Sequence, residues 1–343
     1  MGSAQGESNR RQTGGRSIAA PALLGAALFA AAIGVVVWSM SPARSLGRLE
    51  HEEVSAFSRI RVRSDGDVRA LTFVRENGEE VVQTRVNLAA PHTLLAPYAR
   101  GMFASYLYLP QPRRVLIVGL GGGAMVRFLT HHEPQVQIDA VEIDPAVVRV
   151  ADEYFGVRSG GNVRVHTADA VTFVASTTDR YDVIFMDAFL RPSDDTDTTG
   201  VPTRLKTLAF LGQVRRALAP GGVVAFNINE HASMADDIAA VAATFGQVAV
   251  YRCPPAENRV VIAAEGGLAT TDDAQARVGA LDARFGGTLS FADMLQNRVT
   301  SSSARTLPCP ASRCSCSSSR GSSPRRRSGS GTARARHCSG TSR

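Results

Sequence analysis

Apolar and polar residues alternate with a period of two near the start of the chain's central part. The runs "RIRVRS" and "RALTFV" lie on either side of Asp65-Gly66-Asp67, and "EEVVQTRVNL" follows Asn77-Gly78. Alternation around such turns predicts short antiparallel strands over residues 54–88. Residues 91–109 then predict a helix that ends before Pro110. We expect a small β-domain with its linking helix over residues 50–110.

From Arg113 the pattern changes to short apolar runs followed by amphipathic segments. The first strand is predicted in "RRVLIVGL" and is followed by a helix in "GAMVRFLTHH". The next pair is a strand in "VQIDAVEID" and a helix in "PAVVRVADEYF". The alternation continues as far as two final strands, "QVAVYRC" and "NRVVIAAE". Apolar strands that alternate with amphipathic helices are typical of a parallel sheet covered on both faces. The sequence therefore predicts an α/β, doubly wound domain over residues 111–266 and a C-terminal extension over residues 267–299.

The N-terminal part contains a long segment without charge, between Arg16 and Arg44. Its length matches the roughly 20 apolar residues that cross a hydrocarbon core. It predicts a single transmembrane helix over residues 17–43 after an N-terminal tail of residues 1–16, and a cleaved signal peptide is the alternative. Arginines on both sides of the segment leave its orientation open.

Residues 300–343 are rich in arginine and serine. From residue 301 on they hold nine arginines, no acidic residue and four of the five cysteines. One reading is an arm that binds RNA or an acidic surface, and a second is disorder. A third reading, which we favour, is a frameshifted terminus of a GC-rich gene, because Lys206 is the single lysine among 38 basic residues.

The net charge of +7 comes from the tail, because its nine arginines exceed the whole surplus of positive over negative residues. The rest of the chain is close to neutral, so we expect no nucleic acid among its partners. Cys253 is the one cysteine outside the tail. No disulfide framework and no metal-ligand spacing is indicated there, and we expect no metal.

The stretch "VLIVGLGGGAMVRFL" carries the first sign of a cofactor. It places Gly119, Gly121, Gly122 and Gly123 between a buried strand and a helix. Glycines let the backbone approach a ligand closely, and the helix that follows presents its positive end. These four residues are expected to bind a nucleotide or nucleoside cofactor.

Three acidic residues follow successive strands of the predicted sheet. Glu142 ends the second strand, 23 residues after Gly119, and Asp169 and Asp187 end the third and fourth. Ligands of open α/β sheets bind at the carboxyl ends of the strands, so the three acids should meet the glycine turn in one crevice. The position of Glu142 suits hydrogen bonds to ribose hydroxyls. A nicotinamide oxidoreductase uses only the first acid and is a distant alternative.

The run of residues 54–264 resembles the spermidine synthase (polyamine aminopropyltransferase) family, in a spermidine-synthase-like branch with an N-terminal membrane segment. Four blocks match in order and spacing, namely "RVLIVGLGGG", "AVEIDPAVVRVADEYF", "VRVHTADAVTFV" and "YDVIFMDAF". The resemblance implies a Rossmann-like, class I methyltransferase-type fold, a small-molecule amine acceptor and a possible homodimer. It implies that decarboxylated S-adenosylmethionine or S-adenosylmethionine is the co-substrate. Glu142 would then bind the ribose, Asp169 the adenine amino group, and Asp187 would accept a proton from the attacking amine.

The sequence departs from that family where the amine would bind. Gly122 stands where the family's glycine loop has an Asp, and Leu190 stands where an acid follows the catalytic Asp. Phe57 replaces an expected tyrosine, and the family's Tyr-His-Glu segment reads Tyr98-Ala99-Arg100. A loop with Asp194, Asp195 and Asp197 is a partial compensation that could attract a polycation, or it is a solvated loop.

Gly122 bears on which co-substrate fits. An Asp in the loop would repel the α-carboxylate of S-adenosylmethionine, by about 4 kcal/mol for unit charges ~4 Å apart at an effective dielectric of 20. Glycine removes that repulsion. We expect that the carboxylated co-substrate binds at least as tightly as the decarboxylated one.

Three functions stay open. The first is aminopropyl transfer to a polyamine such as putrescine, and the second is S-adenosylmethionine-dependent methyl transfer on the same fold. The third is a non-catalytic, membrane-tethered binding module. We expect a membrane protein anchored through residues 17–43, with its catalytic domain on the cytoplasmic side, where the co-substrate is.

Overall fold

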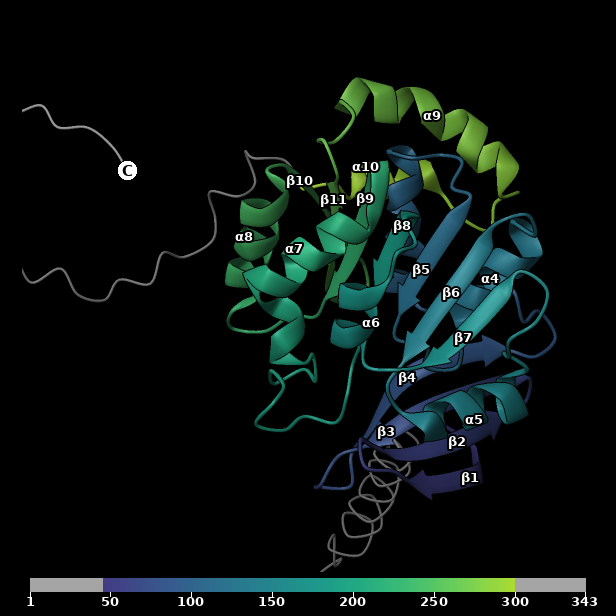
Figure 1. Cartoon of the computed structure of the whole chain (residues 1–343). Helices are drawn as coiled ribbons and strands as arrows, with labels where there is room; N and C mark the ends of the chain where they lie inside the picture. The colour runs from purple at the N-terminus through teal and green to yellow at the C-terminus, as the bar shows by residue number, and fades with distance from the viewer. Residues whose placement is uncertain (1–45, 300–343) are drawn as a thin grey trace, which may run out of the picture. The chain divides into compact units, whose positions relative to one another are not determined.

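The computed structural model describes residues 46–299, which form two β-sheets and their covering helices (Figure 1). The predicted transmembrane helix over residues 17–43, the N-terminal tail and the arginine-rich tail over residues 300–343 lie outside the described residues. Within residues 46–299, no helix combines the length and the apolar character that crossing a membrane requires.

The first sheet is an antiparallel meander of four strands in the order β1-β2-β3-β4. Its strands are β1 (Arg48–Val54), β2 (Arg59–Asp65), β3 (Val68–Val74) and β4 (Glu80–Asn87). The hairpins predicted at Asp65-Gly66-Asp67 and Asn77-Gly78 are confirmed. Strand β1 was not predicted, because its apolar residues Leu49 and Val54 are exposed and give no buried face.

One face of this sheet packs on helix α5 (Pro145–Phe155). Apolar side chains of β2 and β3, such as Ile60, Val62 and Leu71, form a core with Val147 and Val150 of the helix. Pro145 at the first helical position and the Asp144 side chain, which accepts a hydrogen bond from the Ala146 N–H, fix where α5 begins. This packing holds β4 beside the glycine turn.

The second sheet has seven strands in the order β10-β11-β9-β8-β5-β6-β7. The strands, whose arrows fan across the centre of Figure 1, are β5 (Arg114–Val118), β6 (Gln137–Glu142), β7 (Val163–Thr167), β8 (Tyr181–Met186), β9 (Leu218–Ile228), β10 (Val248–Cys253) and β11 (Ala256–Ala264). The five strands from β5 to β9 are mutually parallel. Strand order reverses between β5 and β8, so a ligand crevice is expected at the carboxyl ends of these two strands.

The prediction of a parallel sheet is wrong for strand β11, which runs opposite to the other six strands of this sheet. Strand β11 pairs antiparallel with both β9 and β10. Only Pro254 and Pro255 separate β10 from β11, and parallel neighbours need a crossover of a dozen or more residues. A two-residue connection therefore forces the antiparallel pairing.

Helices cover both faces of the large sheet, as the sequence predicts. On one face lie α3 (Pro97–Met102), the 3-10 helix η1 (Phe103–Leu107), α4 (Ala124–His132), α9 (Thr271–Arg284) and α10 (Phe291–Gln296). The other face carries α6 (Ala170–Ser176), α7 (Leu208–Ala217) and α8 (Met234–Phe245), with the short 3-10 helix η2 (Thr203–Lys206) before α7. Neighbours in β5 alternate between the cores, with Ile117 in the first and Leu116 in the second. The predicted C-terminal extension forms α9 and α10 and packs into the first core.

Candidate active site

The turn after β5 is built from glycines because other residues would not fit. Gly119 has a φ of 96°, and a Cβ atom there would lie 2.1 Å from the backbone oxygen of Asp187. Gly123, the N-cap of α4, has a φ of 68°, and a Cβ atom there would lie 2.7 Å from Val157. Positive φ favours glycine at both positions. The turn thus brings the end of β5 against the end of β8, where the sequence predicts a cofactor.

The middle of the turn is tied to the small sheet. The Gly122 N–H donates a hydrogen bond of 2.9 Å to the hydroxyl of the buried Thr84 in β4. A Cβ atom at Gly122 would come within 3.0 Å of the Thr84 methyl group and 3.1 Å of the Phe155 ring. A side chain at this position would therefore start toward β4 and α5. Gly119 and Gly121 line the two cavities described below, and Gly123 lines a further cavity with Tyr98 and Asp187. Gly122 lines none of the three.

Glu142 occupies the carboxyl end of β6 and is buried. Its two carboxylate oxygens accept hydrogen bonds of 3.0 Å from the N–H groups of Leu120 and Asp144. Burial raises the pKa of this carboxyl, and the backbone hydrogen bonds act in the opposite direction. The carboxylate fixes the glycine turn to the loop before α5, and each oxygen keeps a lone pair for a further donor.

Asp169 lies two residues after β7 and caps α6. It accepts a hydrogen bond of 3.1 Å from the Val171 N–H, and Arg204 Nη1 donates to its other oxygen at 2.7 Å. Together with Glu142 it lines a cavity that also includes Gly119 and Arg204. An adenine amino group bound here must share Asp169 with Arg204 or displace the guanidinium.

Asp187 follows β8 and is half-buried, and two side chains from other elements contact it. Asn227, at the end of β9, donates a hydrogen bond of 2.8 Å to Asp187 Oδ1. The Tyr98 hydroxyl of α3 is the second neighbour of the carboxylate. Burial raises the pKa of Asp187 to about 7, although Asn227 and Tyr98 both lower it. Burial and the neighbouring Asp187 raise the pKa of Tyr98, so its hydroxyl stays protonated. A carboxyl with a pKa near neutral suits a general base.

A second cavity joins Asp187 to the glycine turn. It shares Gly119 and Glu142 with the first cavity. Its remaining walls come mainly from the small sheet, α3 and the loop after β8, through Phe73, Gln83, Thr84, Tyr98 and Phe189. Glu142 and Asp187 are the two carboxylates among the residues that line it. The structure thus brings Glu142, Asp169 and Asp187 to one crevice, with Asp187 at the far end from Asp169.

The positions where the sequence departs from the family pattern do not all face this second cavity. Leu190 lines the Asp169 cavity and an outer one, and Phe57 lines the outer one. Arg100 donates to the backbone oxygens of Leu94 and Leu95 and so holds the loop before α3. The sequence alone did not identify Thr84, Tyr98 and Asn227 as neighbours of the glycine turn and Asp187, although Tyr98 lies in the segment that the resemblance singled out.

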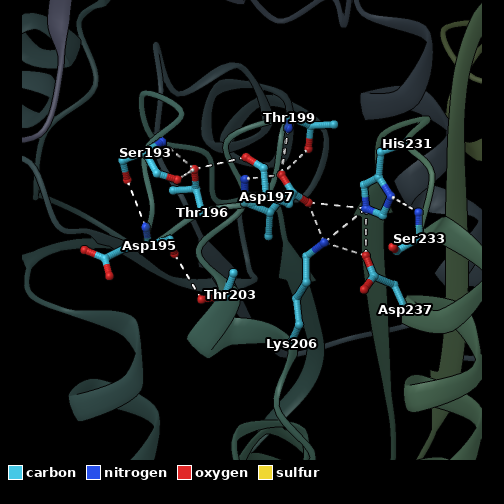
Figure 2. A network of polar contacts seen from close by, with 11 residues as sticks. Ser193, Asp195, Thr196, Asp197, Thr199, Thr203, Lys206, His231, Ser233 and Asp237 are labelled. Atoms are coloured by element: carbon cyan, nitrogen blue, oxygen red, sulfur yellow. Dashed lines mark hydrogen bonds and ion pairs between the residues drawn. The ribbon is translucent and has the colours of Figure 1, made fainter.

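The acidic loop that could attract a polycation is partly engaged elsewhere. Asp197 contacts the ammonium of Lys206, which also lies 2.5 Å from Asp237 Oδ2 and 3.1 Å from His231 Nε2 (Figure 2). One atom from each of Asp197, His231 and Asp237 lies within 4.8 Å of the others, as in a metal site. The Lys206 ammonium already contacts all three groups, so this cluster has its own cation. Asp194 and Asp195 remain exposed.

Comparisons with known proteins place this geometry in context. A spermine/spermidine synthase domain matches residues 102–272. A polyamine aminopropyltransferase of Vibrio vulnificus is 32% identical over 217 residues, which cover 62% of this chain and 70% of that protein. The human eEF1A lysine and N-terminal methyltransferase is 37% identical over 132 residues, covering 36% of this chain and 18% of that protein.

Among solved structures, a probable spermidine synthase from Corynebacterium glutamicum aligns with a TM-score of 0.56. The alignment covers 77% of this chain and 99% of that chain at 21% identity. At that identity the likeness establishes the fold alone, a Rossmann-like, methyltransferase-type domain preceded by a small sheet.

Proposed function

The chain belongs to the spermine/spermidine synthase family, and from this premise we propose that it transfers an aminopropyl group to an amine. The donor is decarboxylated S-adenosylmethionine, and the acceptor is a polyamine such as putrescine. The aminopropyltransferase and the methyltransferase that it matches are both transferases, and this chain is a transferase of the same family. We call the Asp169 cavity the nucleoside cavity and the second cavity the amine cavity. The observation that carries the proposal is Asp187, a carboxyl with a pKa of about 7 that lines the amine cavity, which shares Gly119 and Glu142 with the nucleoside cavity.

The nucleoside half of the crevice would hold the donor. Glu142 accepts hydrogen bonds from the ribose hydroxyls with the lone pairs that its backbone partners leave free, and Asp169 accepts one from the adenine amino group. Gly119 and Gly121 line the wall beside the ribose. In this placement the sulfonium lies near the glycine turn, where the two cavities meet.

The reaction is an in-line displacement at the carbon next to sulfur. The new N–C bond forms as the C–S bond breaks, and the sulfur leaves as a neutral thioether, so no acid is needed. An aliphatic amine has a pKa near 10 in water and must lose a proton before or during attack. Asp187 accepts that proton. Tyr98 and Asn227 orient its carboxylate toward the amine and stop its pKa from rising further.

Methyl transfer from S-adenosylmethionine is a second candidate, favoured by two specific observations. Gly122 offers no negative charge against the α-carboxylate of that donor. The amine cavity is lined by just two carboxylates, Glu142 and Asp187, and Glu142 is assigned to the ribose. The second amine of a diamine therefore lacks an acidic partner among these residues, which suits an acceptor with one amino group.

The two donors can be compared directly. We expect the purified chain to modify an amine acceptor with one donor and not with the other, and mass spectrometry distinguishes an added aminopropyl group from an added methyl group. Putrescine and a single-amine acceptor of equal length serve as paired substrates. Calorimetry with each donor reports binding separately from turnover. Binding of neither donor would refute both candidates and favour the non-catalytic binding module.

A further inference from the structure

A chain of side-chain amides leads away from Asp187 toward the edge of the sheet. Asn227 donates to Asp187 Oδ1 at 2.8 Å, and its own oxygen accepts from Asn258 Nδ2 at 2.8 Å. Asn258 lies near the start of β11, and its Nδ2 group also donates to the Asn229 oxygen. The pairing of β9 with β11 brings these residues together, with Asn227 opposite Val260.

The direction of each hydrogen bond follows from chemistry. An ionised carboxylate only accepts, so Asn227 must turn its amide nitrogen toward Asp187. Its oxygen then faces Asn258 and requires a donor, which the Asn258 nitrogen supplies. If Asn227 were turned over, its oxygen would face the carboxylate, and its nitrogen would face the Asn258 nitrogen. The first contact would then bring two hydrogen-bond acceptors together, and the second would bring two donors together.

This orientation also decides where a proton can sit on Asp187. Asn227 offers Oδ1 a donor and no acceptor, so a proton on Oδ1 would have no partner there. Oδ2 is left for the proton that the reaction delivers, because the neighbouring Tyr98 hydroxyl can accept a hydrogen bond as well as donate one. The amide of Asn227 is 7% exposed, so water does not readily replace a missing partner.

We infer that Asn258 is a positioning residue: it fixes the amide of Asn227 with its nitrogen toward Asp187, which reserves Oδ2 of the carboxyl for the transferred proton. The catalytic meaning of this inference rests on the proposed function, whereas the orientation itself does not. Among the described residues, Tyr98 of α3 and Glu142 of β6 neighbour Asp187 in the amine cavity, and Arg85 of β4 lines a further cavity that Asp187 borders. On the far side of Asn227 lies a cavity lined by Lys206, His231, Asp197 and Asp237.

The test follows the carboxyl carbon of Asp187 by NMR in the full chain labelled with 13C-aspartate, with the signal assigned through Asp187→Asn. Asn258→Leu removes the donor without adding charge and should raise the titration midpoint of Asp187 by about one pH unit. Asn227→Leu should raise it at least as much. Adding Asn258→Leu to Asn227→Leu should change nothing further, because Asn258 acts through Asn227.

Asn229→Ala is the matched control. It removes the other acceptor of the same Asn258 nitrogen and leaves the bond to Asn227, so the midpoint should stay where it is. If Asn258→Leu does not fold, Asn258→Ala gives the same readout with a smaller side chain. An unchanged midpoint in the Asn258 variant, or additive shifts in the double variant, overturns the inference.

The NMR titration of Asp187 does not depend on turnover. The dependence of kcat/KM on pH tests the catalytic role. With an active donor, Asn258→Leu should lower kcat/KM about fivefold at pH 7, because a one-unit rise in the midpoint leaves about a tenth of Asp187 ionised instead of half, and it should approach the wild-type rate above pH 8. A merely structural role would lower the rate equally at every pH, and that outcome overturns the positioning role. A chain that shows the midpoint shift but transfers nothing from either donor contradicts the proposed function and leaves the orientation intact.

Discussion

Asp187 is the residue on which the proposed chemistry depends, and its raised pKa has two consequences. Asp187→Asn should lower the rate of amine alkylation by about 10²–10⁴-fold, the usual contribution of a general base. Donor binding should stay within a few-fold, because Glu142 and Asp169 are the residues proposed to hold the nucleoside. Steady-state kinetics and calorimetry check both values, and equal losses in rate and donor affinity would contradict the assignment.

The same substitution makes a prediction about stability. The pKa of Asp187 in the fold is about 7, above its ordinary value of 3.8. Its protonated form therefore favours the fold, and this contribution is fully present below pH 4 and lost as the pH rises through 7. Asp187→Asn should consequently unfold at a higher temperature than the wild type at pH 8 and show little difference at pH 4. A lower melting temperature at pH 8 would contradict the raised pKa.

Gly122 tests which donor the turn accepts. Because a side chain here would meet the Thr84 methyl group, the substitution is best made in a Thr84→Ser background. Gly122→Asp and Gly122→Asn then differ in charge and not in shape. We expect the Asp variant to bind S-adenosylmethionine about 1 kcal/mol more weakly than the Asn variant. Calorimetry with decarboxylated donor should show no such loss, and equal affinities for both variants would refute the electrostatic argument.

At the scale of elements, β4 is the strand that fixes the small sheet to the catalytic crevice. One end of it carries Glu80, which is buried and pairs with Arg61 and Arg63 of β2, and further along it carries Thr84, which holds the glycine turn. Strand β4 thus connects the ion pairs of Glu80 in the small sheet with the Thr84 hydrogen bond to the glycine turn. Loss of either should loosen the wall of the amine cavity.

Glu80 makes the stability of this sheet depend on pH. Burial alone would raise the pKa of its carboxyl, but hydrogen bonds from Arg63, Arg61 and Thr72 lower it to about 2 from 4.5. A depressed pKa contributes stability above pH 4.5 that is lost as the pH falls toward 2, about 3 kcal/mol at most. Glu80→Gln should therefore unfold more easily at pH 7 and approach the wild type near pH 2. Denaturant unfolding at both pH values checks this, and a constant difference would contradict it.

At the scale of the whole molecule, the described residues 46–299 bring the glycine turn, Glu142, Asp169 and Asp187 together over three apolar cores. The C-terminal helices α9 and α10 belong to the first core, so a boundary at residue 266 would expose it. The anchor over residues 17–43 and the homodimer remain predictions.

A chain limited to residues 46–299 should therefore fold and bind the donor with the affinity of the full chain. A chain ending at residue 266 is the matched control and should fail to fold, because it lacks the buried Leu281, Phe285 and Phe291. Circular dichroism and calorimetry measure both properties. Failure of the 46–299 chain to fold would show that residues outside this range stabilise it.

Local pattern was enough to predict much of the fold. The helix in "GAMVRFLTHH" and the start of α5 at Pro145 were predicted because apolar periodicity and a proline in the first turn act over a few neighbours. The same local logic placed Glu142, Asp169 and Asp187 after successive strands, and the parallel register of those strands brings them together. The sequence by itself therefore determined the layered architecture and the acids of the crevice.

The tertiary structure decided the rest, because it joins residues whose distance along the chain no local pattern encodes. Thr84 reaches the glycine turn across 38 positions, and Asn227 reaches Asp187 across 40. Strand β1 is held by backbone pairing and by ion pairs of Glu52 with β2. It has no buried apolar face, so the pattern of apolar residues did not predict it. The antiparallel end of the sheet follows from a two-residue connection between strands. The environment that gives Asp187 its raised pKa exists only once β8, β9 and α3 have packed together, since burial is a property of the assembled core.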